Sequence, residues 1–246
     1  MPLQLWIEKM TQINIKPSHH LSVMGRTGAG KSVFQHKVLI PALQQQKNSV
    51  LVILDGKNEY TDFKTTVNSP QELNEMLYAD NKRPKVIRCI VTEPTEEIAE
   101  EYLRAAWAPW ATTRQPKNRK NFAVRFFIED MPIYYNSPYA TPYWLMKWVS
   151  FGRSYHRTVV ISTQRAQMVP KTPLQMVEYN FIFKMNSYDR KMVIKQYYGD
   201  KANNAVTTLP QYGYVLVSDL HDAPIIFKPY SGGNLPSQDI GIDLNG

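Results

Sequence analysis

The sequence predicts an α/β fold with a mostly parallel central sheet and helices on both of its faces. Apolar runs rich in Val and Ile recur along the chain, as expected of strands that are covered on both sides. Segments of helical composition stand between these runs, and such alternation is typical of parallel sheets. A glycine-rich loop also joins the first predicted strand to the first predicted helix.

The predicted elements follow one another at regular intervals. The strands are Leu21–Met24, Val50–Leu54, Val86–Val91, Val124–Ile128, Thr158–Ser162, Phe181–Met185 and Tyr214–Val217. The helices are Lys31–Gln46, Pro70–Ala79, Thr95–Trp107, Tyr143–Tyr155 and Ser187–Tyr198. The second helix carries a clear start signal, because Ser69 can serve as its N-cap, with Pro70 first in the helix and Glu72 completing a capping box.

Composition predicts one soluble globular domain. Hydrophobic residues make up 43% of the 246 residues and charged residues 20%, which excludes a disordered chain. No apolar run is long enough for a membrane span, and the N-terminus lacks the layout of a signal peptide. The single cysteine excludes an internal disulfide and a cysteine-cluster metal site. The net charge of +8 favours a polyanionic partner.

We expect this domain to span residues 1–230, followed by a flexible tail at 231–246. Residues 1–20 are expected to form an N-terminal strand or arm. Residues 109–121 form a polar, basic, turn-rich excursion just before the fourth strand.

The segment "GRTGAGKS" predicts a nucleotide phosphate site. It matches the G-x-x-x-x-G-K-[ST] pattern and lies between an apolar strand and a helix. Its glycines allow successive backbone N–H groups to point into one concavity. Lys31 is expected to reach the β- and γ-phosphates of ATP, and the Ser32 hydroxyl to bind Mg²⁺. The expected nucleotide-binding residues are Gly25, Thr27, Gly28, Ala29, Gly30, Lys31, Ser32 and Val33.

Polar residues end two later strands. "FFIED" places Glu129 and Asp130 after an apolar run, and a phosphate loop needs a nearby carboxylate for the Mg²⁺ shell and a base to orient the attacking water. "RTVVISTQR" ends its strand in Thr163 and Gln164. Gln164 can hydrogen-bond the γ-phosphate or its water without adding charge. The sequence therefore predicts a P-loop NTPase site.

Together these segments resemble the FtsK/HerA superfamily of hexameric DNA-pumping ATPases, and within it the small viral genome-packaging ATPases. The resemblance runs from Leu21 to Val217. "VLVILDGKNEYTDF" looks like the second strand of that family, with its acid at Asp55 and its Glu-Tyr pair at Glu59 and Tyr60. The resemblance implies a RecA-like fold that closes with a late antiparallel hairpin.

The order of the acid pair departs from this family, which usually has Asp before Glu. In one alignment Glu129 takes the metal side and Asp130 is the base. In the other, Asp130 keeps the metal and Met131 falls at the base position. A slip of one residue turns a side chain to the other face of a sheet, so only one alignment can hold. We favour the first, because "VRFFI" is then an unbroken apolar strand. The segment "MPIYYNSPYATPYW" that follows is expected to be a packed aromatic loop.

The resemblance also implies an arginine that acts on the neighbouring subunit and a basic surface that binds DNA. Ring ATPases complete each site with an arginine from the next subunit, and the resemblance puts this role on Arg153, with Arg157 as the alternative. The densest basic cluster is the expected DNA-binding surface, since sequence-blind motors hold the DNA backbone. It contains Arg114, Lys117, Arg119 and Lys120.

The resemblance thus implies an ATP- and Mg²⁺-dependent translocase of double-stranded DNA that packages a viral genome into a preformed capsid. It would act as a homo-oligomeric ring, a hexamer by family precedent, in the host cytoplasm or at the packaging vertex of the virion. Expected partners are the capsid vertex or membrane-associated packaging proteins. The alternatives are a cellular-type HerA/FtsK translocase and a non-motor ATP-dependent switch or assembly factor.

Overall fold

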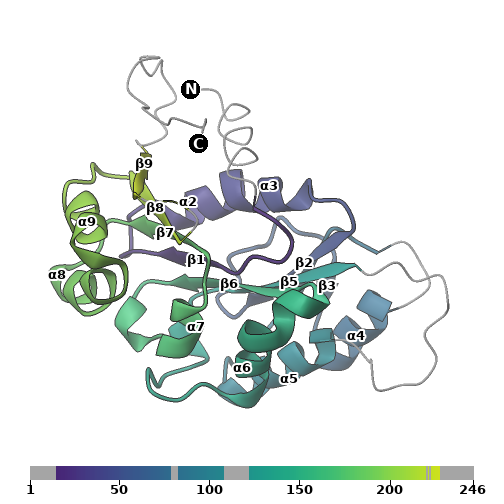
Figure 1. Ribbon diagram of the computed structural model, residues 1–246. Coiled ribbons are helices and arrows are strands. Elements are labelled where there is room, and N and C mark those ends of the chain that lie inside the picture. The colour runs from purple at the N-terminus through teal and green to yellow at the C-terminus, as the bar shows by residue number, and fades with distance from the viewer. Residues whose placement is uncertain (1–14, 79–82, 108–121, 220, 222, 228–246) are drawn as a thin grey trace.

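The computed structural model describes residues 15–78, 83–107, 122–219, 221 and 223–227. Nine strands of this part of the chain form one sheet in the order β3-β4-β2-β5-β6-β1-β7-β8-β9 (Figure 1). The strands are β1 (Leu21–Met24), β2 (Ser49–Asp55), β3 (Thr66–Val67), β4 (Val86–Ile90), β5 (Ala123–Ile128), β6 (Arg157–Thr163), β7 (Tyr179–Phe183), β8 (Tyr214–Ser218) and β9 (Ile225–Phe227).

Strands β1 to β7 are mutually parallel, whereas β8 runs antiparallel to β7 and β9 antiparallel to β8. The predicted fold class is therefore confirmed, including the late antiparallel hairpin. All seven predicted strands are present, with ends shifted by at most two residues. The short strands β3 and β9 escaped prediction, because two or three residues carry too little periodicity.

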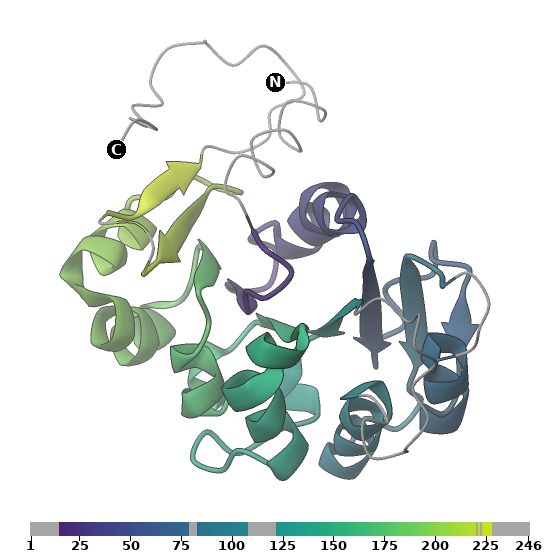
Figure 2. The same ribbon diagram turned by 45° about the vertical axis from the view of Figure 1, so that its right-hand side comes forward.

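Helices cover both faces of the sheet. The helices are α2 (Lys31–Phe34), α3 (Ile40–Gln44), α4 (Pro70–Tyr78), α5 (Glu96–Trp107), α6 (Tyr143–Phe151), α7 (Lys171–Gln175), α8 (Ser187–Asp189) and α9 (Gln196–Thr207). Helices α2 and α3 lie on one face and α4, α5 and α6 on the other, in the view of Figure 1 and in the turned view of Figure 2. Each face buries its own apolar cluster, so side chains of the sheet alternate between two cores.

The predicted helices are confirmed with local changes. Residues 35–39 form a π-helical stretch that joins α2 to α3, and residues 190–195 form another between α8 and α9. The predicted end of the last helix at Tyr198 coincides with a kink, because Gly199 has the non-helical angles φ 78° and ψ 180°, and a second helical segment follows it within α9. Glycine tolerates this conformation, which most residues avoid.

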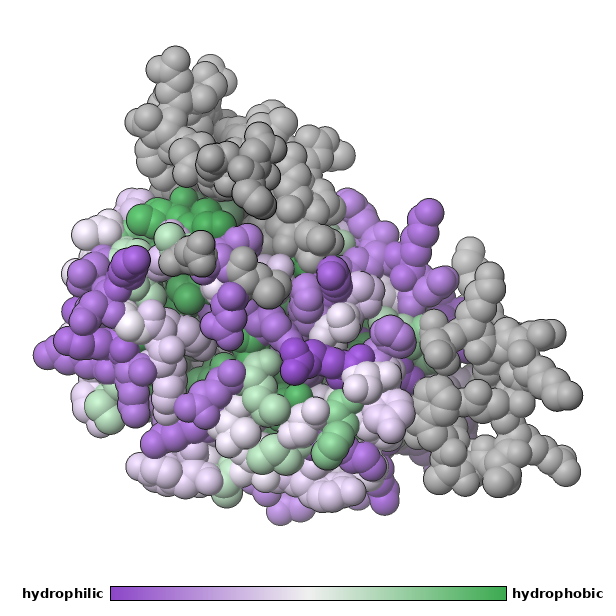
Figure 3. All heavy atoms as spheres, in the orientation of Figure 1, coloured by the Kyte–Doolittle hydropathy of each residue, from purple (hydrophilic) through white to green (hydrophobic). Residues whose placement is uncertain are grey.

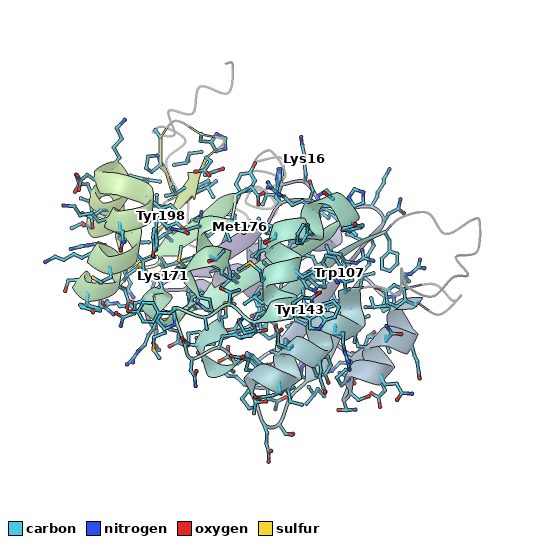
Figure 4. The ribbon with its side chains drawn as sticks, turned by 60° about the horizontal axis from the view of Figure 1, so that its bottom comes forward. Lys16, Trp107, Tyr143, Lys171, Met176 and Tyr198 are labelled. Carbon is cyan, nitrogen blue, oxygen red and sulfur yellow. The ribbon has the colours of Figure 1, made fainter. Side chains whose placement is uncertain are left out.

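The Pro- and Tyr-rich segment before α6 is packed, as expected, in its first part only, since Tyr139 is 84% exposed. Tyr134 and Tyr135 are buried in the core. Figure 4 shows Trp107 and Tyr143 close together on the face that α5 and α6 cover, and the Lys147 ammonium lies 5.2 Å and 5.6 Å from their ring centroids. The loop is therefore part of the packing between α5 and α6.

Hydrophilic residues cover most of the described surface in the view of Figure 3, with hydrophobic ones in small separate areas. Among the helices that the structure describes, none has both the length and the apolar composition that crossing a membrane requires. The excursion at 109–121, with Arg114, Lys117, Arg119 and Lys120, lies outside the described residues, as do the tail at 231–246 and most of the N-terminal arm.

Candidate nucleotide-binding site

The predicted site residues lie at the carboxyl ends of neighbouring parallel strands. Strand β1 lies between β6 and β7, and β5 and β2 follow on the far side of β6 (Figure 1). The phosphate loop follows β1, Gln164 follows β6, and the acid pair follows β5. The carboxyl ends of parallel strands meet at one edge of the sheet, which is where open α/β sheets bind ligands.

The phosphate loop has the backbone that its glycines allow. Gly28 and Gly30 have φ of 73° and 102°, a region that side chains with a Cβ rarely occupy. A Cβ at Gly25 would lie only 2.6 Å from the Cβ of Phe183, so β7 approaches too closely for any other residue. This approach fixes the start of the loop.

Lys31 is folded back over this loop. Its buried ammonium donates hydrogen bonds to the carbonyl oxygens of Gly25 (2.7 Å) and Arg26 (3.3 Å). Burial lowers the pKa of Lys31, and the carboxylates of Glu129 and Asp130 oppose that shift. The ammonium thus lies in the field of both acids, where it can meet a phosphate.

Gln164 connects the phosphate loop with the acid pair. Its side-chain carbonyl accepts a hydrogen bond from the Thr27 hydroxyl (2.5 Å). Its side-chain amide and its backbone N–H donate to the Asp130 carboxylate, both at 3.4 Å. A movement of Thr27 in the phosphate loop can therefore alter the position of Asp130 through the Gln164 side chain alone.

Glu129 is 4% exposed, and its carboxylate accepts a hydrogen bond from the Tyr60 hydroxyl at 2.8 Å. Burial raises the pKa of Glu129 to about 7, although the Tyr60 hydrogen bond opposes the shift. Desolvation of this kind disfavours the charged carboxylate until a cation compensates it. Tyr60 was predicted only as part of a Glu-Tyr pair, and its bond to Glu129 had no sequence signal.

Asp130 has different neighbours. Its backbone is left-handed, with φ 47° and ψ 64°, so the chain turns sharply directly after β5. Its carboxylate pairs with the ammonium of Lys57, a residue that sequence reasoning missed. The only signal for Lys57 was its place two residues after the acid that ends β2.

Asp55 shapes the loop that carries Lys57 and Tyr60. Its buried carboxylate accepts hydrogen bonds from the backbone N–H groups of Glu59 and Tyr60, both at 3.0 Å. It also pairs with the buried guanidinium of Arg88 at 2.7 Å. Asp55 therefore holds the loop in place and is not itself at the acid pair.

The residues present fit a magnesium ion. Ser32 is exposed at the end of the phosphate loop, and the Glu129 carboxylate is desolvated while lying close enough to Lys31 to affect its pKa. Within the described residues no three His, Cys, Asp or Glu side chains gather as a metal cluster. A site with one hydroxyl and one carboxylate suits Mg²⁺, which keeps several waters and relies on substrate phosphates.

The two candidate arginines differ in how exposed their guanidinium groups are. Arg153 is 56% exposed in its side chain and pairs with Glu178 at 2.6 Å. It precedes β6 and so lies at the amino-end edge of the sheet, opposite the phosphate loop of its own subunit. Arg157 is buried and donates to the carbonyl oxygens of Trp107 and Phe122, so its guanidinium is not available to another subunit. The burial of Arg157 therefore favours Arg153 over the alternative.

Comparison of the sequence with protein-family models shows which family the chain belongs to. The family described as "Helicase HerA, central domain" matches residues 10–207. The chain belongs to this family. The FtsK/HerA resemblance is thus confirmed, over the region that holds the phosphate loop, the acid pair and Gln164. No curated protein matches the chain.

Solved structures share the fold of this HerA-family chain. The genome packaging NTPase B204 from Sulfolobus turreted icosahedral virus 2, in complex with AMPPCP, has 17% identity and a TM-score of 0.70, with 88% of this chain and 100% of that chain covered. VirB4 of Thermoanaerobacter pseudethanolicus has 10% identity and a TM-score of 0.57, with 86% and 89% covered. The pCW3 conjugation coupling protein TcpA has 14% identity and a TM-score of 0.54, with 86% and 60% covered.

Proposed function

We propose that this chain is a Mg²⁺-dependent ATPase that translocates double-stranded DNA as a homo-oligomeric, hexameric ring. The observation that carries the proposal is the hydrogen-bonded connection from Thr27 through Gln164 to Asp130. It joins the expected phosphate cradle to the expected base, so a nucleotide bound at the cradle can affect the position of the base. Membership of the HerA family supports the same activity.

In this proposal each part of the site has one task. The phosphate loop and Lys31 hold the β- and γ-phosphates, and Ser32 and Glu129 hold the Mg²⁺. The ion, when bound, neutralises charge that develops on the phosphate oxygens. Asp130 accepts a proton from the attacking water as the water oxygen bonds to the γ-phosphorus, and the β–γ bridging oxygen leaves with ADP. Gln164 orients that water.

The assignment of Glu129 to the metal and Asp130 to the base has structural support. Both acids follow the last residue of β5, Ile128, as the favoured alignment requires. The other alignment puts Met131 at the base position, but Met131 is completely buried in the apolar core. A side chain there cannot approach a nucleotide.

We further propose that the DNA is a viral genome that is moved into a preformed capsid. The support is the fold shared with B204, described as a genome packaging NTPase, along the whole length of that protein. The ring would then work in the host cytoplasm or at the packaging vertex, against capsid-vertex or membrane-associated proteins. Protection of duplex DNA from nuclease by cognate empty capsids, protein and ATP tests this point.

The motor proposal is tested by ATP turnover with and without duplex DNA, with Lys31→Ala as the inactive control. We expect duplex to stimulate hydrolysis in the wild type and ATP to favour a higher oligomer. An absence of both effects would contradict the motor and favour an ATP-dependent switch or assembly factor. Stimulation without DNA protection by capsids would favour a cellular-type HerA/FtsK translocase.

A further inference from the structure

A second loop lies against the phosphate loop, on the side away from the acids. It comprises residues 210–213, between α9 and β8. The side-chain amide of Gln211 donates a hydrogen bond to the Gly28 carbonyl oxygen at 2.9 Å. A Cβ built on Gly30 would lie 3.3 Å from the ring of Tyr212. The Tyr212 ring is therefore next to the phosphate loop.

The two sides of the phosphate loop differ in chemistry. On the β6 and β5 side lie Gln164 and Asp130, which are polar and charged. On the β7 and β8 side lies Tyr212, which directly precedes Gly213 and β8 and is 57% exposed. A nucleoside triphosphate has the same polarity, with a charged end and an aromatic end.

Tyr212 also occupies a position that disfavours tyrosine. Gly213 donates its N–H to the Pro210 carbonyl oxygen at 3.1 Å, which closes a four-residue turn. Tyr212 is third in this turn and has φ 64°. Turns with positive φ at the third position favour Gly or Asn, because a bulky residue there is strained. Strain of this kind clusters at ligand sites.

We propose that Tyr212 binds the base of the nucleotide by stacking. This proposal rests on the proposed ATPase function and names the part of the site that holds the purine. Stacking on an aromatic ring uses the face of the base and not its hydrogen-bonding edge. ATP and GTP should therefore bind with similar affinity.

Displacement of a fluorescent ADP analogue tests the proposal without any need for turnover. The competitors are ADP and inorganic tripolyphosphate, which has no base. Tyr212→Phe keeps the ring and should bind ADP within about two-fold of the wild type, whereas Tyr212→Asn and Tyr212→Leu should bind ADP about ten-fold more weakly. Tripolyphosphate should bind all variants equally. Tyr143→Ala removes another exposed tyrosine and serves as the matched control.

The melting temperature separates binding from folding. Tyr212→Asn should melt no lower than the wild type, because Asn tolerates positive φ. Unchanged ADP affinity in Tyr212→Asn and Tyr212→Leu would overturn the proposal, and so would an equal loss of tripolyphosphate affinity. If the wild type binds ADP through Tyr212 but does not hydrolyse ATP, only the ATPase proposal fails. If it hydrolyses ATP with no effect at Tyr212, only the base site fails.

Discussion

Glu129 and Asp130 are adjacent in the chain, yet their carboxylates have different environments. Glu129 is bound by the neutral Tyr60 hydroxyl and is desolvated. Asp130 is bound by the Lys57 ammonium and by Gln164. A desolvated acid gains most from a metal ion, and an acid hydrogen-bonded to Gln164, the proposed γ-phosphate sensor, is well placed to accept a proton.

Substitution of each acid should therefore affect a different step. Asp130→Asn should lower kcat by at least about a hundred-fold while ATP binding remains, because the proton acceptor is lost. Glu129→Gln should raise the Mg²⁺ concentration needed for half-maximal turnover. Steady-state ATPase assays over a Mg²⁺ titration, with nucleotide binding measured separately, distinguish the two. The opposite pattern would exchange the roles of Glu129 and Asp130.

At the scale of single elements, Glu100 explains how α6 begins. The carboxylate of Glu100, on α5, accepts hydrogen bonds from the backbone N–H groups of Trp144 (2.6 Å) and Leu145 (3.1 Å) and from the Tyr135 hydroxyl (3.2 Å). The first N–H groups of a helix have no partner within it, so α5 caps α6 from outside. This cap holds the aromatic loop in place.

Loss of this cap should destabilise the protein. Glu100→Ala leaves two N–H groups without their acceptor and should lower the free energy of unfolding by about 1–2 kcal/mol. Glu100→Gln should cost less, because its amide oxygen still accepts one hydrogen bond. Urea unfolding measures both, with the exposed Glu101→Ala as the control. Equal stability of Glu100→Ala and Glu101→Ala would exclude the capping role.

His20 links the start of β1 to both neighbouring strands. Its Nδ1 accepts a hydrogen bond from the Val159 N–H in β6 at 3.1 Å, and its carbonyl oxygen accepts from the Tyr179 N–H in β7 at 3.4 Å. Burial, with the charges of Arg153 and Arg125, lowers the pKa of His20 to about 3. The folded protein therefore holds this imidazole neutral.

The protein should lose stability as the pH falls below the ordinary histidine pKa of 6.5 towards the folded value of about 3. In that range the unfolded chain binds a proton at His20 that the folded chain does not bind. Relative to His20→Gln, the wild type should lose about 2 kcal/mol between pH 7 and pH 5. Urea unfolding at several pH values measures this difference. Parallel pH profiles would contradict the assignment.

At the scale of the whole molecule, the predicted site residues lie at two opposite edges of the sheet. The phosphate loop, acid pair and Gln164 lie at the carboxyl-end edge, whereas Arg153 lies at the amino-end edge. Arg153 therefore cannot complete the site of its own subunit. A ring in which the amino-end edge of one subunit faces the carboxyl-end edge of the next would bring them together.

Mixing of defective subunits tests this arrangement. Arg153→Ala and Lys31→Ala rings should each lose most turnover, because an arginine in trans contributes about 10³–10⁵-fold in related phosphoryl-transfer sites. In a random equal mixture, about a quarter of the interfaces combine an intact Lys31 with an intact neighbouring Arg153, so activity should return in part. Steady-state ATPase assays of the mixture measure this recovery.

The control mixes Lys31→Ala with the Lys31→Ala, Arg153→Ala double variant, in which no interface has an intact Lys31. No recovery in the first mixture would show that the arginine assignment is wrong.

Local pattern by itself determined the sheet strands, the helices between them, the phosphate loop and the position of the acid pair. Each of these is encoded within one short segment, where apolar periodicity and residue spacing follow directly from strand and helix geometry. The elements that escaped prediction, such as β3 and β9, are too short for periodicity. The place of Gln164 directly after an apolar strand indicated its role, whereas the role of Arg153 came only from the resemblance to a family.

Only the tertiary structure decided which of these residues meet. Thr27 and Gln164 are 137 residues apart, Tyr60 and Glu129 are 69 apart, and Glu100 lies 44 before Trp144. The order of strands in the sheet brings each pair together, and that order is set by packing of both apolar faces. Lys57 at Asp130 and Tyr212 beside Gly30 arise in the same way. Short segments of the sequence thus determine which chemical groups are present, and the fold determines which of them contact one another.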